Sequence, residues 1–248
     1  MSGIEVDDVL ERFVADARSA APVTAIWAHG SLALGDYQHG RSDLDLIAVV
    51  ESDLSSDQKR DLERVHRELM EHQPGAAKLH CSYMPASSLS AVDAKHFTWA
   101  QSRVLNRPVT PVTRRELHLG QRALHGPSPL ALLPSVSDQQ LTDFVRQDLR
   151  EYWRPKTAKP MYWMIDIWVD LGMLTAARAS VTLREGRLIT KGEALDVLTA
   201  QGAPAEIVED IRARRYADAV SLNPYRRRRR GRRTRMFLRP AIDRALAL

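Results

Sequence analysis

Residues 28–50, AHGSLALGDYQHGRSDLDLIAVV, constrain the fold more than any other stretch of the chain. An apolar run over residues 23–28 predicts a strand, and a second apolar run over residues 44–50 predicts another. Between them lie Gly30 and Ser31, which predict a turn of small residues, and then a polar loop. Glycine lets the backbone approach a phosphate closely, and serine adds a hydroxyl to the exposed amides.

Two carboxylates stand at the start of the second predicted strand. Strand side chains alternate with period two, so Asp43 and Asp45 point to one face while Leu44 and Leu46 point to the other. Carboxylates placed side by side raise each other's pKa, and such a pair usually has a divalent cation beside it. Mg²⁺ often takes one or two carboxylates together with substrate phosphates. The pair therefore predicts a magnesium site with Asp43 and Asp45 as its ligands.

The combination of Gly30-Ser31, a polar loop and Ser42-Asp43-Leu44-Asp45-Leu46 resembles the nucleotidyltransferase superfamily, which includes polymerase beta-like folds. The Asp-x-Asp segment is especially similar to the aminoglycoside adenylyltransferases that act on streptomycin and spectinomycin. The resemblance implies an α+β fold, in which a nucleotidyltransferase domain with a mixed sheet and flanking helices precedes an all-α helical bundle. A hairpin that carries acidic residues on its wet face is the structural alternative.

Composition limits the classes of protein that remain. The 248 residues suit one large domain or two small ones, and 44% of them are hydrophobic. No run is long and apolar enough for a membrane span, and the acidic N-terminus does not resemble a signal peptide, so we expect a cytoplasmic protein. Cys81 is the single cysteine, which excludes an internal disulfide and a zinc cluster of cysteines.

Periodicity and turn residues predict the order of elements and the domain boundary. We expect catalytic and helical domains over residues 1–130 and 131–248, with a third strand over residues 78–85. Residues 154–160 are expected to form a loop, and residues 92–106 give no clear assignment. Within residues 161–182 an apolar stripe that includes Met164 and Leu171 is expected to be buried. Helices are predicted at 4–20, 32–34, 58–71, 113–125, 137–152, 161–182, 190–200, 203–217 and 235–248.

The third predicted strand carries the main departure from the family pattern. In the resembling family, this strand has a third acidic residue on the face of the Asp pair, which acts as a metal ligand or as general base. The best-matching position here is His80. A neutral imidazole can accept a proton near neutral pH but is a poorer Mg²⁺ ligand than a carboxylate. His80 is thus the candidate base, with a non-catalytic polar strand residue as the alternative.

The second half of the chain also resembles the helical domain of the streptomycin and spectinomycin adenylyltransferases. The matching segments are 174–178 and 185–194. The family's arginine and second lysine, which touch nucleotide phosphates, carry over to Arg178 and Lys191. Tyr216 falls near an aromatic residue that stacks on adenine in that family. The alternative for Arg178 and Lys191 is that both are exposed helix residues.

A basic tract follows this segment and accounts for the net charge of the chain. The net charge is +5, and eight arginines between 226 and 235 supply +8, which leaves −3 for the remainder. Such a tract can neutralise phosphates and bind nucleic acid without sequence preference, or it can be a solvated segment without a partner. The candidate contacts are Arg226, Arg227, Arg228, Arg229 and Arg230.

The resemblance implies Mg²⁺-dependent transfer of AMP from ATP to a hydroxyl of a small acceptor, such as an aminoglycoside. Gly30, Ser31 and Ser42 would position the phosphates, while Arg178 and Lys191 would offset charge on pyrophosphate. One alternative is a nucleotide-binding relative with a regulatory role and impaired catalysis. Another is a transferase that acts on nucleic acid or protein.

Overall fold

The structure, a computed structural model, describes residues 3–218 and 221–248. The chain divides into two compact units, Met1–Val136 and Ser137–Leu248. The division follows Val136, whereas the sequence placed it after residue 130. Among the described residues, every helix is too short or too polar to cross a lipid bilayer.

The N-terminal unit is built on one mixed sheet of six strands in the order β5-β4-β3-β2-β1-β6. β2 and β3 run parallel, and the other neighbouring strands pair antiparallel. The mixed sheet confirms the predicted fold class, and β1 and β2 have the predicted bounds. The strands are β1 (Val23–Ala28), β2 (Leu44–Val50), β3 (Leu79–Pro85), β4 (Lys95–Ala100), β5 (Arg103–Pro108) and β6 (Ala123–His125).

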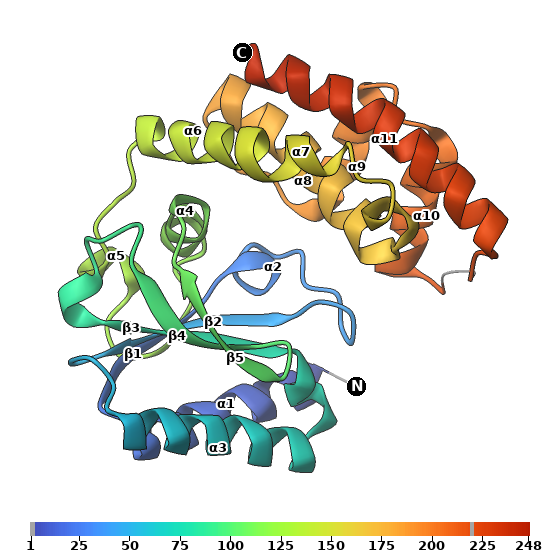
Figure 1. The fold of residues 1–248 in the computed structure, drawn as a ribbon. Coiled ribbons are helices and arrows are strands. Elements are labelled where there is room, and N and C mark those ends of the chain that lie inside the picture. Colours follow the sequence, from blue (N-terminus) through green and yellow to red (C-terminus); the bar gives the residue numbers. More distant parts are fainter. Residues whose placement is uncertain (1–2, 219–220) are drawn as a thin grey trace. The chain divides into compact units, whose positions relative to one another are not determined.

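Helices cover both faces of this sheet (Figure 1). Leu44 and Leu46 of β2 join the apolar core under α1 and α3, while Ile47 and Val49 join a second core that includes Leu117 of α4. The alternation along β2 therefore separates its apolar residues into two cores. The helical elements are α1 (Gly3–Ala20), α2 (Gly30–Ala33), α3 (Ser56–His72), η1 (Pro74–Lys78), η2 (Ala86–Ser88), α4 (Pro111–Gly120) and α5 (Pro129–Leu132).

The core under α3 contains an aromatic cluster and the single thiol of the chain. The ring of His66 stacks on Trp99 with 5.1 Å between centroids, and its Nε2 lies 2.8 Å from the hydroxyl of Tyr83. Burial, with a smaller contribution from the charge of His80, lowers the pKa of His66 to about 3. Cys81 on β3 is 1% exposed, and burial raises the pKa of its thiol. His66 is therefore neutral, and Cys81 is a protonated core residue.

The structure corrects two sequence interpretations in this unit. The helix predicted over residues 113–125 ends at Gly120, because Gln121 adopts a left-handed conformation with φ 47°, and β6 follows. The unassigned segment 92–106 forms most of the β4–β5 hairpin. Its turn consists of Gln101 and Ser102, both with positive φ (55° and 58°). A turn with two left-handed residues suits a hairpin but normally carries glycine or asparagine, so its sequence gave no turn signal.

The C-terminal unit is helical throughout its described regular elements, as predicted. Capping boxes begin α6 at Ser137 and α9 at Thr190. The first part of the expected loop 154–160 is helical. The elements are α6 (Asp138–Gln147), a π-helical turn η3 (Asp148–Trp153), α7 (Arg154–Lys156), η4 (Tyr162–Met164), α8 (Asp166–Glu185), α9 (Lys191–Ala200), α10 (Ala205–Tyr216) and α11 (Pro224–Leu246).

Trp163 lies at the centre of this unit, and two glycines allow the helices to approach it. A Cβ on Gly172 of α8 would lie 2.6 Å from the indole ring, and one on Gly231 of α11 would lie 2.6 Å from the Trp163 carbonyl oxygen. The helix expected over residues 161–182 is interrupted because Ile165 is extended, and α8 begins at Asp166. The predicted buried stripe is wrong at Met164, Leu171 and also Ile165, all of which are exposed. The apolar side of α8 faces Trp163 instead.

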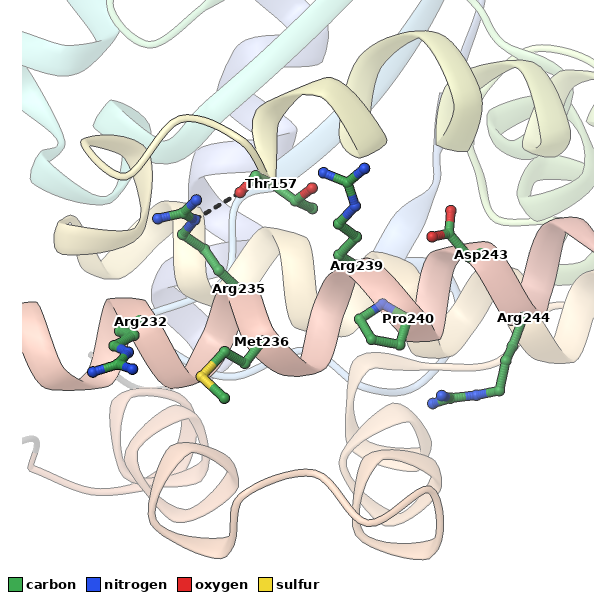
Figure 2. Close-up of a pocket in the computed structure, with 8 residues that line it drawn as sticks. All are labelled: Thr157, Arg232, Arg235, Met236, Arg239, Pro240, Asp243 and Arg244. Atoms are coloured by element: carbon green, nitrogen blue, oxygen red, sulfur yellow. Dashed lines mark hydrogen bonds between the residues drawn. The ribbon is translucent and has the colours of Figure 1, made fainter.

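The last helix starts earlier than the sequence predicts. The sequence placed its start at residue 235, but α11 begins at Pro224, where the side chain of Asn223 accepts a hydrogen bond from the Arg226 amide. The arginine tract is thus the first half of a 23-residue helix that continues through Pro240. Figure 2 shows side chains along the second half of this helix.

Candidate active site

The two carboxylates of the Asp-x-Asp segment lie where β2 begins. Asp43 directly precedes the strand and Asp45 is its second residue. Leu44 and Leu46 are 2% and 1% exposed, whereas the side chains of Asp43 and Asp45 are 47% and 32% exposed. The predicted alternation is confirmed, and both carboxylates are accessible to a ligand.

Gly30 brings the end of β1 against these carboxylates. The amide of His29 donates to the carbonyl oxygen of Asp45 at 2.9 Å, which joins the two strands at this edge. Gly30 has φ +61°, and a Cβ at this position would lie 3.1 Å from Oδ2 of Asp45. The position therefore requires glycine both for its backbone and for the space beside Asp45. Ser31 follows within the single turn of α2 and is partly buried.

Ser42 shapes the loop between these elements. Its side chain is buried, and its Oγ accepts a hydrogen bond from the amide of Gln38 at 2.9 Å. The amide of Ser42 donates to the carbonyl oxygen of Gln38 at 2.8 Å. The hydroxyl thus closes the polar loop immediately before Asp43.

His80 lies directly beside Asp45 on the neighbouring strand. The two residues are partners in the parallel β2–β3 register, and Nδ1 of His80 is 3.2 Å from Oδ1 of Asp45. Lys78 lies at the same edge, with Nζ 3.8 Å from Oδ1 of Asp43 and hydrogen-bonded to the carbonyl of Arg41 at 2.8 Å. The structure therefore brings His80 to the position that the sequence expected.

A second polar pair, missed in the sequence, adjoins the same edge. Nδ1 of His29 lies 3.4 Å from Oε2 of Glu116 on α4, and their side chains are 17% and 8% exposed. Burial alone would lower the pKa of His29, but the hydrogen bond with Glu116 and the charges of Asp45 and Glu116 raise it overall. The one available sequence signal was the position of His29 directly before Gly30, because Glu116 is distant in the sequence.

The donor set fits Mg²⁺. Within residues 3–218 and 221–248, no three His, Cys, Asp or Glu side chains are arranged to hold a metal. Mg²⁺ characteristically needs fewer protein ligands, because it keeps waters and uses substrate phosphates alongside one or two carboxylates. Asp43 and Asp45 are accessible and adjacent, and they meet this requirement.

In the helical unit, Arg178 of α8 is hydrogen-bonded to the segment that leads into α9 and Lys191. Nε of Arg178 donates to the carbonyl of Ile189 at 2.9 Å, two residues before Lys191. Lys191 is the first residue of α9, after the capping residue Thr190. Tyr216 ends a different helix, α10; it is 42% exposed, and the guanidinium of Arg215 lies 5.3 Å from its ring centroid.

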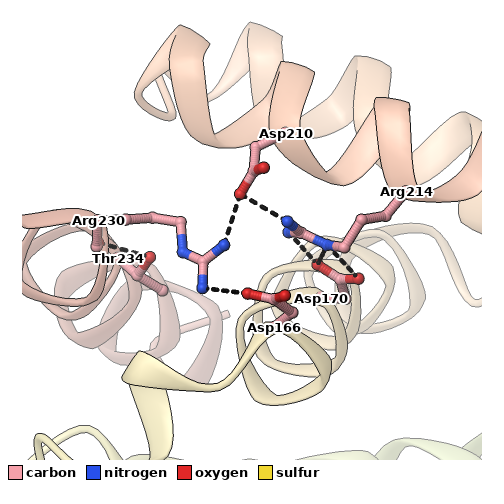
Figure 3. Close-up of polar contacts among 6 residues, drawn as sticks. All are labelled: Asp166, Asp170, Asp210, Arg214, Arg230 and Thr234. Carbon is pink, nitrogen blue, oxygen red and sulfur yellow. Dashed lines mark hydrogen bonds and ion pairs between the residues drawn. The ribbon is translucent and has the colours of Figure 1, made fainter. Parts of the chain in front are cut away.

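The basic tract contributes to a separate, structural cluster (Figure 3). Arg230 is 5% exposed and binds Asp166 at 2.5 Å and Asp210 at 2.7 Å. Arg214 binds Asp170 through two nitrogens, at 2.6 and 2.9 Å, and also reaches Asp210 at 2.7 Å. Although burial would lower it, these hydrogen bonds raise the pKa of Arg214. Arg230 is therefore a buried cross-link between α8, α10 and α11, which corrects its assignment to a solvated or nucleic-acid-binding tract.

Comparison with known proteins found a matching domain family and a similar fold. Residues 10–106 match the family model described as nucleotidyltransferase domain. The crystal structure of spectinomycin adenyltransferase AAD(9) from Enterococcus faecialis with ATP and spectinomycin resembles this chain with a TM-score of 0.70 and 14% sequence identity. The match covers 95% of this chain and 98% of that chain. No curated protein sequence matches. Residues 10–106 therefore carry a nucleotidyltransferase domain, and the fold of the chain is similar to that of the spectinomycin adenyltransferase structure.

Proposed function

We propose that the chain transfers AMP from ATP to a hydroxyl of a small acceptor of the aminoglycoside type, with Mg²⁺, and releases pyrophosphate. The observation that carries this proposal is the accessible Asp43–Asp45 pair, held beside a left-handed Gly30. That AAD(9) was crystallised with ATP and spectinomycin supports the choice of co-substrate and acceptor class.

Asp43 and Asp45 would hold Mg²⁺, which when bound neutralises charge on the phosphates of ATP. Gly30 leaves room for a phosphate beside Asp45, and Ser31 offers its hydroxyl from the same turn. Phosphoryl and nucleotidyl transfer depend mainly on such positioning and on electrostatic stabilisation.

His80 is the proposed base. When Nδ1–H donates to Asp45, the lone pair is on Nε2, which can take the proton of the acceptor hydroxyl. The hydroxyl oxygen forms a bond to the α-phosphorus, and the bond from that phosphorus to the bridging oxygen of pyrophosphate breaks. The proton taken by His80 then passes to solvent.

Arg178 and Lys191 are proposed to supply positive charge to the leaving pyrophosphate. The hydrogen bond from Arg178 to Ile189 fixes the segment that leads to Lys191, so the two cations form one element of the helical unit. The exposed ring of Tyr216 is the proposed stacking surface for adenine.

An aminoglycoside is polycationic, so its binding calls for carboxylates with open lone pairs. Asp166, Asp170 and Asp210 are already bound by arginines, and we do not assign them this role. The acceptor panel for an assay should therefore include neutral polyhydroxylated compounds beside streptomycin and spectinomycin.

The test is pyrophosphate release from ATP across this panel, with Mg²⁺ or with EDTA, and with GTP, CTP and UTP as competing donors. We expect release that needs an acceptor, Mg²⁺ and ATP, and the mass of the product should exceed that of the acceptor by one adenylyl group, which is AMP less one water. Pyrophosphate release in the absence of any acceptor, or equal use of all four nucleotides as donors, would contradict the proposal.

The presence of His80 where the family has a carboxylate favours one second candidate function, because imidazole is a poorer Mg²⁺ ligand. This candidate is a nucleotide-binding protein with impaired catalysis. Calorimetry separates the two functions. Micromolar ATP binding with no turnover on any acceptor, followed by gain of turnover in His80→Glu, would support the second candidate.

A further inference from the structure

An open groove of about 780 Å³ runs along the outer side of the second half of α11 (Figure 2). All of its lining comes from the helical unit. The lining residues are Thr157, Arg232, Arg235, Met236, Arg239, Pro240, Asp243 and Arg244. Four arginines and one aspartate give this lining a net charge of +3.

Two of the charged residues are held by the protein. Arg235 donates from Nε to the carbonyl of Thr157 at 2.6 Å, and Asp243 accepts from Nε of Arg154 at 2.6 Å. The other three arginines, Arg232, Arg239 and Arg244, are exposed. Among the residues that the structure describes, none forms a hydrogen bond or ion pair with these three guanidiniums. They are available to an anionic ligand.

The three available arginines spread over the exposed half of the helix surface: Arg232 and Arg239 are nearly in line, and Arg244 lies about 140° further round the helix axis. The opposite side, which includes Thr234, Leu238 and Ile242, is buried. At 1.5 Å per residue, the rise from Arg232 to Arg239 is about 10 Å and from Arg239 to Arg244 about 8 Å. Cations spread over about 18 Å along the helix axis exceed what one small phosphate can contact and suit a ligand with repeated phosphates.

The composition of the groove selects among such ligands. Its lining has no aromatic ring, so it offers no stacking surface for the bases of a single strand. Its apolar lining is limited to Met236 and Pro240, whereas a helix that lies on a membrane needs a broad apolar face. A duplex keeps its bases stacked and presents only phosphates and sugars to such a surface.

We propose that this groove binds the sugar-phosphate backbone of a nucleic-acid duplex without sequence preference, through Arg232, Arg239 and Arg244. The site differs from the tract Arg226 to Arg230 that the sequence suggested, and it does not depend on the nucleotidyltransferase activity.

The test is fluorescence anisotropy of the full chain with a labelled 20-base-pair DNA duplex and an RNA duplex of the same sequence. The test variant is Arg232→Gln/Arg239→Gln/Arg244→Gln. Its matched control, Arg226→Gln/Arg228→Gln/Arg229→Gln, removes the same charge from exposed positions of the same helix that lie outside the groove. A third variant, Arg232→Lys/Arg239→Lys/Arg244→Lys, keeps the charge.

We expect roughly micromolar binding by wild type at low salt, and weakening on the order of a hundredfold in the groove variant at 0.1 M salt. The slope of log K against log salt should fall by about 3 for B-DNA, because each phosphate contact contributes about 0.9. The control triple should keep most of the affinity, and the lysine triple should keep most of the slope. Equal melting temperatures would show that all the variants are folded.

Three results would overturn the proposal. The first is no duplex binding by wild type at 50 mM salt. The second is equal loss in the groove and control triples, which would indicate diffuse attraction to total charge. The third is groove-dependent binding to inorganic polyphosphate or to vesicles with phosphatidylserine but not to either duplex, which would assign the groove to another anion.

Discussion

The two units treat clustered carboxylates in opposite ways. At the edge of β2, Asp43 and Asp45 are partly exposed, and their contacts with Lys78 and His80 are 3.8 and 3.2 Å long. In the helical unit, by contrast, Asp170 and Asp210 are engaged by Arg214 and the buried Arg230 at 2.6–2.7 Å. Carboxylates that arginines bind at short distance, here called the filled cluster, hold helices together, whereas the partly exposed carboxylates Asp43 and Asp45, here called the open pair, are accessible to a cation and substrate.

The largest effect should come from removing one carboxylate of the open pair. Asp45→Asn removes one of two metal ligands, and we expect pyrophosphate release to fall by about 10³-fold or more, which corresponds to ~4 kcal/mol. The melting temperature should not fall, because the side chain is partly exposed and loses a like-charged neighbour. Asp53→Asn, at an exposed aspartate after β2, is the control. Near-normal turnover in Asp45→Asn would show that this carboxylate is not needed for catalysis.

The converse change breaks the filled cluster. Arg230→Met leaves the partly buried Asp210 with one arginine instead of two, and we expect a loss of about 3 kcal/mol in the free energy of unfolding, measured with guanidinium chloride. Arg228→Met, on the exposed side of the same tract, should change it by less than about 0.5 kcal/mol. Equal effects of the two variants would show that the tract is uniform, contrary to the burial of Arg230.

His66 extends the comparison to a buried group with no counter-ion. Its pKa of about 3 in the folded protein lies below the ordinary value of 6.5, so between these values the unfolded chain binds a proton that the native state excludes. Stability should therefore decrease as pH falls from about 6.5 toward 3, by roughly 2 kcal/mol at pH 5 from this group. His66→Gln should reduce stability at pH 7 but flatten this dependence in urea melts at pH 4.5–7.5. If the free energy of unfolding of His66→Gln changed with pH as steeply as that of wild type, His66 would not be the source of the pH dependence.

A smaller effect should follow from crowding the open pair without changing its charge. In Gly30→Ala, the new Cβ would lie 3.1 Å from Oδ2 of Asp45, and we expect activity to fall about tenfold with a stability cost of ~1 kcal/mol. Gly35→Ala is a matched control, because Gly35 also has positive φ (+74°) but has open space around its Cβ position. If both variants lose the same activity, backbone strain and not the contact with Asp45 is responsible.

The smallest effect concerns the cation beside Asp43. Lys78→Gln removes a half-exposed ammonium at 3.8 Å, and such contacts contribute up to about 1 kcal/mol. Apparent affinity for Mg²⁺, measured from the dependence of turnover on its concentration, should rise by at most about fivefold. Lys59→Gln, exposed on α3, should leave it unchanged. Weaker Mg²⁺ dependence in Lys78→Gln would indicate that the lysine positions Asp43 instead of competing for it.

Sequence alone located the open pair but not the filled cluster, for a physical reason. Asp43 and Asp45 follow a period-two pattern within a few residues, and His80 pairs with Asp45 through a regular strand register. The bonds of Arg230 to Asp166 and Asp210 depend instead on how three helices pack, and no local period encodes them. The pair His29–Glu116 was missed for the same reason.

Elements with local signals were predicted with nearly correct bounds, and those that depend on distant partners were not. β1 and β2 matched the predicted residues because apolar runs and turn residues marked them. β6 has three residues and is defined by its pairing with β1, which the local sequence does not reveal. The helix predicted over residues 113–125 therefore included it. Asn223 caps α11, but the sequence predicted a solvated segment for the arginines that follow it. Their carboxylate partners on α8 and α10 are distant in the sequence and could not be identified from it.

The burial of Cys81 has a consequence for measuring how each unit opens. The thiol reacts only as an exposed thiolate, so alkylation requires β3 to separate from its neighbours. Because the chain has one cysteine and it lies in the N-terminal unit, the labelling rate reports the opening frequency of that unit alone. Under native conditions this rate would register a change caused by Gly30→Ala, while remaining silent when Arg230→Met loosens only the helical unit.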